Sequence, residues 1–87
     1  MKYSKEQLHA AHKISYANKT RLSVPQKCGC FYCLRFFSSE DIVDWSVDKP
    51  DWTAICPYCG IDSVIGENDG YPLTKDFLEE MFEEWFG

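Results

Sequence analysis

The segments Cys30-Phe31-Tyr32-Cys33 and Cys56-Pro57-Tyr58-Cys59-Gly60 decide how this chain of 87 residues is organised. Each segment holds two cysteines separated by two residues, a spacing that lets both sulfurs point at one ion. Two such pairs supply four thiolates, which is the ligand set of a closed, tetrahedral structural zinc site. The sequence therefore predicts one structural Zn²⁺ held by Cys30, Cys33, Cys56 and Cys59. Iron bound by the same sulfurs is the alternative metal.

We call the turn at Cys30–Cys33 knuckle 1 and the turn at Cys56–Cys59 knuckle 2. The residue that follows such a turn often has a positive φ, which suits Gly60. Leu34 stands at the equivalent position of knuckle 1, where a leucine would be strained, so we expect knuckle 1 to turn differently. The fifth cysteine, Cys28, is an alternative ligand in place of Cys30, or else a buried thiol beside the site.

The composition is that of a folded protein, with 45% hydrophobic and 16% aromatic residues. No apolar run is long enough to span a membrane, and the N-terminus has no apolar stretch of the signal-peptide type. We therefore expect a cytoplasmic protein whose thiols stay reduced. The odd number of cysteines also argues against a disulfide framework, and no βαβ pattern surrounds either pair, as a thioredoxin-like site would require.

The chain is expected to form one domain over residues 1–87, with a helical segment at 1–22, a metal-binding core at 27–66 and an amphipathic helix at 73–87. Ser4 and Gln7 form a capping-box pattern, which predicts a helix from about Lys5 to Lys19. Thr74 is a suitable N-cap for the last helix. That helix combines an acidic face with a wide apolar stripe, which consists of Phe77, Leu78, Met81, Phe82, Trp85 and Phe86.

Shorter elements are expected between these helices. The polar run at 38–41 predicts a helical segment from Glu40 to Trp45, and residues 48–51 have the composition of a turn. Residues 52–55 and 63–66 are strand candidates, and we expect them to pair as a hairpin across knuckle 2. The prediction is thus a small α+β fold, in which two knuckles and a short hairpin lie between two helices.

Charge is distributed unevenly along the chain, whose net charge is −5. Residues 1–35 hold seven of the nine Lys and Arg but one of the fourteen Asp and Glu. Either the two halves attract each other, or the protein presents an oriented electrostatic surface to a partner. A nucleic-acid surface would draw on basic and aromatic residues of the N-terminal part, namely Lys5, Lys13, Lys19, Arg21, Lys27 and Arg35 with Tyr16, Phe31 and Tyr32.

The acidic balance favours a protein partner over nucleic acid. Phe82 and Phe86, at the edge of the apolar stripe, are the surface candidates, whereas most of the stripe is expected to be core. His9 and His12 lie three residues apart on the first helix and are either solvated side chains or ligands for a metal or phosphate. Catalysis is not expected, because four cysteines leave a metal no open position and no histidine lies between the knuckles.

The two cysteine motifs resemble those of zinc ribbons and rubredoxin-type knuckle proteins. A closer resemblance covers residues 28–86, through the motifs at 28–33 and 53–66 and the tail segments 77–81 and 85–86. These are similar to an uncharacterised family of small "cytoplasmic proteins" of bacteria and their phages. In that family a histidine often follows the tail methionine, where this chain has Phe82. The resemblance implies a zinc-binding domain in the cytosol and no particular activity.

Overall fold

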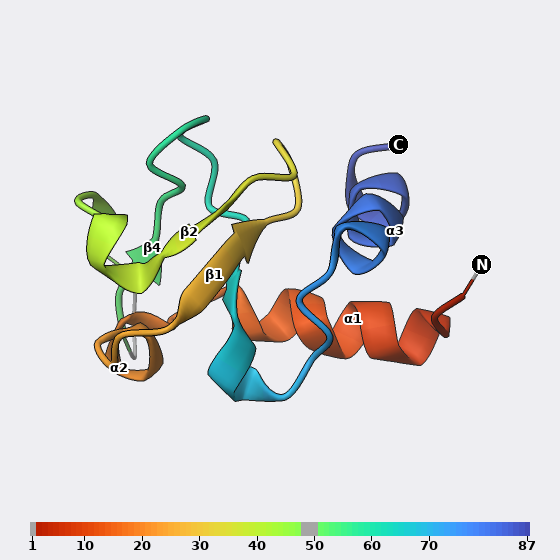
Figure 1. Ribbon diagram of the computed structural model, residues 1–87, viewed down its shortest axis with the longest axis horizontal. Coiled ribbons are helices and arrows are strands. Elements are labelled where there is room, and N and C mark those ends of the chain that lie inside the picture. Colours follow the sequence, from red (N-terminus) through yellow and green to blue (C-terminus); the bar gives the residue numbers. More distant parts are fainter. Residues whose placement is uncertain (1, 48–50) are drawn as a thin grey trace.

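The computed structural model describes residues 2–47 and 51–87. The chain forms small antiparallel sheets and three α-helices within these residues. In chain order the elements are α1 (Lys5–Ile14), α2 (Lys19–Leu22), β1 (Lys27–Cys30), β2 (Phe36–Ser38), the 3₁₀ turn η1 (Ser39–Asp41), β3 (Trp45–Ser46), β4 (Thr53–Ala54), β5 (Val64–Gly66), the 3₁₀ turn η2 (Glu67–Asp69) and α3 (Lys75–Trp85) (Figure 1). The small α+β architecture is thus confirmed.

The first helix begins as predicted but ends early. The Ser4 hydroxyl oxygen accepts a hydrogen bond from the Gln7 amide at 3.1 Å. The helix ends at Ile14 instead of Lys19, because the Ser15 hydroxyl turns back to donate to the carbonyl of His12 at 2.6 Å. Ala17 then takes a left-handed conformation with a φ of 52°, so the chain leaves the helix axis before α2 begins.

The predicted hairpin between residues 52–55 and 63–66 is wrong. Strand β5 pairs with β1 in a three-stranded sheet of order β2-β1-β5, and β4 pairs with β3 in a separate two-stranded sheet. The fully buried side chain of Asn18 lies between the two candidates. Its Nδ2 donates to the Val64 carbonyl at 3.1 Å, and its Oδ1 accepts from the Ala54 amide at 2.9 Å. A side chain therefore bridges the two strands that were expected to bond directly.

The helix predicted from Glu40 to Trp45 is also wrong. Its N-terminal signal is real, because Ser38 accepts a hydrogen bond from the Glu40 amide and Asp41 accepts one from the Ser38 amide. The turn stops after Asp41, and Trp45 begins strand β3 instead. Of the turn predicted over 48–51, residues 48–50 lie outside the described residues.

The core consists of two clusters of buried residues. One surrounds the knuckles and contains Leu22, Cys28, Cys30, Phe37, Ile42, Ala54, Cys56 and Val64. The other joins the helices to the sheet and contains Leu8, Ala11, Phe31, Ile65, Phe77, Leu78 and Met81. Phe77, Leu78 and Met81 of the apolar stripe of α3 are therefore core, and the partly buried Trp85 packs against them, which agrees with the prediction for most of the stripe.

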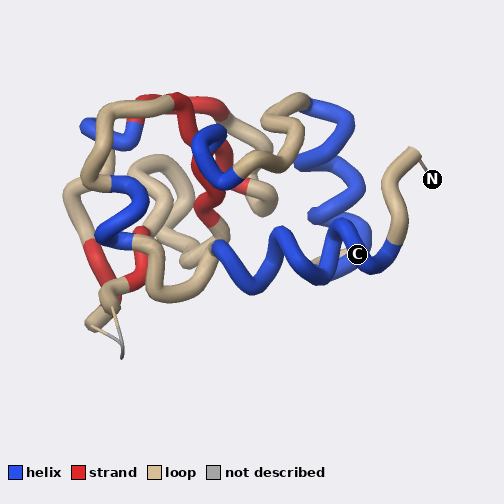
Figure 2. Tube along the Cα trace, turned by 90° about the horizontal axis from the view of Figure 1, so that it is seen from below, coloured by secondary structure: helices blue, strands red, loops and turns tan. Residues whose placement is uncertain are grey.

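The two longer helices lie together at the end of the molecule that carries both termini (Figure 2). Helix α3 begins at Thr74, whose Oγ1 accepts from the Phe77 amide at 3.2 Å. The helix lies close to β1, because a Cβ on Gly29 would come within 3.1 Å of methyl groups of Leu73 and Leu78. No helix in the described part of the chain has the length and apolar character needed to cross a bilayer.

Candidate metal centre

The sulfurs of Cys30, Cys33, Cys56 and Cys59 converge, all within 4.8 Å of one another. The Sγ atoms of Cys30 and Cys59 are 3.6 Å apart, and those of Cys33 and Cys56 are 3.7 Å apart. A tetrahedral ion with metal–sulfur bonds of ~2.3 Å would separate its sulfurs by ~3.8 Å. A disulfide would bring them to about 2.05 Å, and all five cysteines are free. The four thiols thus have the spacing to hold one metal ion.

Knuckle 1 is built by three hydrogen bonds from its own backbone. The Leu34 amide donates to the Cys30 carbonyl at 2.9 Å, and the Cys30 amide donates to the Arg35 carbonyl at 3.0 Å. The Tyr32 amide points at the Cys30 sulfur, 3.4 Å away. The two bonds between backbone groups shape the turn, and the Tyr32 amide is a donor that stabilises a thiolate at Cys30.

Knuckle 2 repeats this pattern residue by residue. The Gly60 amide donates to the Cys56 carbonyl at 3.1 Å, and the Cys56 amide donates to the Ile61 carbonyl at 2.9 Å. The Tyr58 amide points at the Cys56 sulfur at 3.4 Å. Two equivalent turns therefore present their sulfurs to a common centre.

The expectation that knuckle 1 turns differently is wrong. Leu34 has a φ of 65°, close to the 77° of Gly60, so both turns close in the left-handed region. A left-handed conformation costs a leucine roughly 1–2 kcal/mol. The Leu34 side chain packs against the core cluster between the helices. Leu34 is partly buried, so its packing supplies only part of the ~1.5–3 kcal/mol that full burial of a leucine contributes, and this offsets some of the backbone strain.

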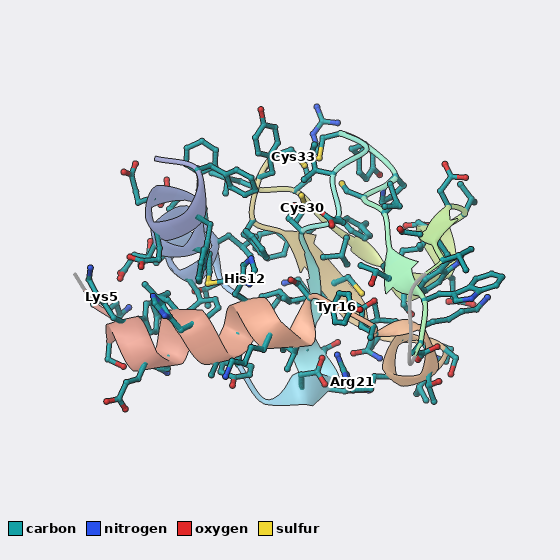
Figure 3. The ribbon with its side chains drawn as sticks, turned by 180° about the vertical axis from the view of Figure 1, so that it is seen from behind. Lys5, His12, Tyr16, Arg21, Cys30 and Cys33 are labelled. Atoms are coloured by element: carbon teal, nitrogen blue, oxygen red, sulfur yellow. The ribbon has the colours of Figure 1, made fainter. Side chains whose placement is uncertain are left out.

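The rest of the fold fixes the two knuckles relative to each other. Strand β1 ends at Cys30, and Cys56 follows shortly after β4. The hydroxyl of Ser63 lies 3.0 Å from the Cys30 sulfur and links the segment before β5 to knuckle 1. Figure 3 shows Cys30 and Cys33 on the part of the molecule that lies above α1 in that view. No sequence motif marks Ser63 or Asn18, because their partners are distant in the chain.

Burial, hydrogen bonds and the neighbouring sulfurs shift the pKa values of three of the four thiols. Burial and the neighbouring thiols raise the pKa of Cys33 and Cys59 above the ordinary value. The pKa of Cys56 is lowered although burial opposes this, because amide groups of knuckle 2 donate to its sulfur. A bound dication would attract all four thiolates and so outweigh their mutual repulsion. Metal binding at this site must therefore displace the thiol protons.

Cys28 lies outside the four-sulfur cluster. It is fully buried in β1, in the same core cluster as the knuckles. Burial, and then the carboxylates of Glu67 and Asp69, raise the pKa of Cys28 to about 12. The structure therefore places Cys30 among the other three sulfurs, and Cys28 has the surroundings of a buried neutral thiol.

His9 and His12 point toward α3 and not toward a shared ion. The His9 Nε2 atom lies 2.8 Å from Oε2 of Glu84. The His12 ring lies against Trp85, with ring centroids 3.9 Å apart. Within residues 2–47 and 51–87, the four cysteines are the one group of three or more His, Cys, Asp or Glu side chains placed to hold an ion.

Comparison of the chain with protein-family models, with curated proteins and with solved structures gives no match. The likeness to zinc-ribbon knuckles therefore depends on the cysteine motifs and on the geometry of the two turns.

Proposed function

We propose that this chain is a small cytosolic protein that binds another protein, and that one structural zinc ion keeps its binding surface in shape. The observation that carries the proposal is an aromatic surface formed by the exposed Tyr32 and Phe86 and the half-buried Phe82. The Tyr32 ring lies 4.8 Å from Phe86 and 5.9 Å from Phe82, centroid to centroid. Tyr32 is 43% exposed and Phe86 is 42% exposed. Aromatic residues that remain exposed in a cluster are typical of protein interfaces.

The metal centre and this aromatic surface share one turn of the chain. Tyr32 lies inside knuckle 1, between Cys30 and Cys33, so an ion that closes the knuckle also fixes Tyr32 against α3. Zinc bound by four thiolates contributes on the order of 10 kcal/mol to folding, comparable with the whole stability of a small domain. A zinc ion with four cysteine ligands has no open position, so its proposed role is structural.

Charge next to the aromatic surface indicates the chemistry of the partner. Glu79 and Glu83 flank Phe82 on α3 and are both exposed. The chain carries a net charge of −5, and a zinc ion with four thiolates adds two further negative charges. A partner segment that combines apolar and basic side chains would complement both features.

Nucleic acid is the second candidate, and the placement of the cations counts against it. Lys5 and Arg21 lie toward opposite ends of α1 (Figure 3), and each pairs with an acid of the C-terminal half, Glu84 and Asp69 respectively. Lys19 lies over the Trp52 ring at 4.2 Å. Phe31 is 1% exposed and has no free face for a base. These contacts favour attraction between the two halves over a phosphate-binding strip.

The test is a capture experiment with extract from the source cell, in which the zinc-loaded protein is the bait. We expect Phe82→Glu to lose a partner that the wild type retains after nuclease treatment and in high salt. Val43→Glu is the matched control, because Val43 is 76% exposed and belongs to the segment between η1 and β3, which lies at the other end of the molecule from α3 (Figure 1). An unchanged set of captured proteins in Phe82→Glu would refute the interaction surface. A partner that dissociates steeply with salt and nuclease would favour nucleic acid.

A further inference from the structure

A small cavity opens beside the aromatic surface, where the end of α1, knuckle 1, the segment before β5 and the C-terminus of α3 meet. Its volume is 120 Å³, and its walls include His12, Tyr16, Phe31, Asp62, Ser63 and Phe86. Phe86 belongs to both the cavity and the aromatic surface. At ~30 Å³ per water molecule, the space holds about four waters or one small polar group. Figure 3 shows His12 on the side of α1 that faces the segment carrying Cys30, with Tyr16 just beyond the end of the helix.

The groups that line the cavity are suited to a cation that donates hydrogen bonds. Asp62 supplies a carboxylate at an exposed position, and no lysine or arginine lines the cavity. Burial lowers the pKa of His12 more than the nearby Asp62 raises it. The cavity is therefore anionic and rich in acceptor oxygens, which disfavours a phosphate or carboxylate ligand.

Phe86, which is exposed, supplies the accessible aromatic face of the cavity, and the buried Phe31 ring lies beside it. Phe31 and Phe86 lie 5.9 Å apart, centroid to centroid, with an angle of 36° between their planes. Aromatic faces attract cations, and a planar guanidinium stacks on them better than an ammonium does. Guanidinium also carries five N–H donors and no acceptor, which matches a cavity lined by a carboxylate and hydroxyl groups.

We propose that this cavity receives the guanidinium group of an arginine side chain on the protein partner. The inference depends on the proposed function, and it names the residue of the partner that docks beside Tyr32, Phe82 and Phe86. Asp62 pairs with the guanidinium, and the exposed ring of Phe86 stacks against its plane. The hydroxyl of Ser63 joins this cavity to the Cys30 sulfur, so the metal centre also holds the wall of the cavity in place.

The test is an NMR titration of the zinc-loaded protein with N-acetyl-arginine methylamide. We expect amide and side-chain shifts confined to the cavity residues, with a Kd of roughly 1 mM, which is typical of a single small contact. The citrulline analogue, which has the same shape without charge, and the lysine analogue should each bind at least several-fold more weakly. Asp62→Asn should weaken arginine binding about three- to fivefold, as expected for loss of one exposed ion pair.

Asp44→Asn is the matched control, because Asp44 is exposed and does not line the cavity. Equal binding of the citrulline or lysine analogue, or an unchanged affinity in Asp62→Asn, would overturn the inference, as would the absence of shifts at the cavity. If a partner is lost in Phe82→Glu but arginine does not bind, the arginine inference fails and the interaction surface stands. If arginine binds and Phe82→Glu captures the same proteins as wild type, the proposed surface fails.

Discussion

Replacing Asn18 with alanine tests the arrangement of the two sheets. The substitution removes the bridge between β4 and β5 and leaves the Ala54 amide and the Val64 carbonyl without partners, in residues that are fully buried. Each unsatisfied buried group costs about 1–3 kcal/mol, so we expect a loss of about 3 kcal/mol in the free energy of unfolding. A small domain has roughly 5–15 kcal/mol in total, so this loss is a large fraction.

The assay is urea denaturation followed by circular dichroism at a fixed concentration of free zinc, because bound metal contributes to the measured stability. Asn68→Ala is the matched control, since Asn68 is exposed and should change stability by less than about 0.5 kcal/mol. In a thermal melt, the Asn18→Ala loss should lower the Tm by roughly 12–24 °C. If Asn18→Ala remains within about 0.5 kcal/mol of wild type, the bridge does not hold the sheets together.

Three further predictions concern single residues. Gly60→Ala should cost about 1–2 kcal/mol of stability in the same denaturation assay, because Gly60 has a φ of 77°. The added Cβ meets no atom within 4 Å, so no new contact compensates for the strain. An unchanged urea midpoint would contradict this. Cys28 should resist iodoacetamide at pH 8 in the zinc-loaded protein but react in urea, as read by mass spectrometry, and rapid alkylation of the native form would show that it is not buried. The hydrogen bond from His9 lowers the pKa of Glu84 below 4.5, the ordinary pKa of a glutamate. The interaction therefore stabilises the fold above pH 4.5, and this stabilisation is lost as the pH falls through the lowered pKa. The difference in unfolding free energy between wild type and Glu84→Gln should therefore shrink with acidification, and a difference independent of pH would refute the assignment.

Sequence patterns predicted the features that depend on neighbouring residues. The start of α1 at Lys5 and of α3 after Thr74 followed from local caps, and the buried face of α3 followed from its helical period. The convergence of the four sulfurs followed from the spacing within each knuckle, because a two-residue spacer can present two sulfurs to one point.

Features that depend on distant residues could not be predicted in this way. A short run such as 52–55 indicates extended backbone but not which strand it pairs with, and the choice here depends on a side chain far away in the sequence, Asn18. The left-handed turn at Leu34 was missed for the same reason. Its strain is visible in the local sequence, whereas the packing that offsets it comes from the helices.

X-ray absorption at the metal edge of the freshly purified protein tests the central claim most directly. The account predicts one zinc ion per chain with four sulfur neighbours at ~2.3 Å and no nitrogen or oxygen in the first coordination shell. A first shell that contains nitrogen or oxygen, fewer than four sulfurs, or a protein that retains no stoichiometric metal would contradict it.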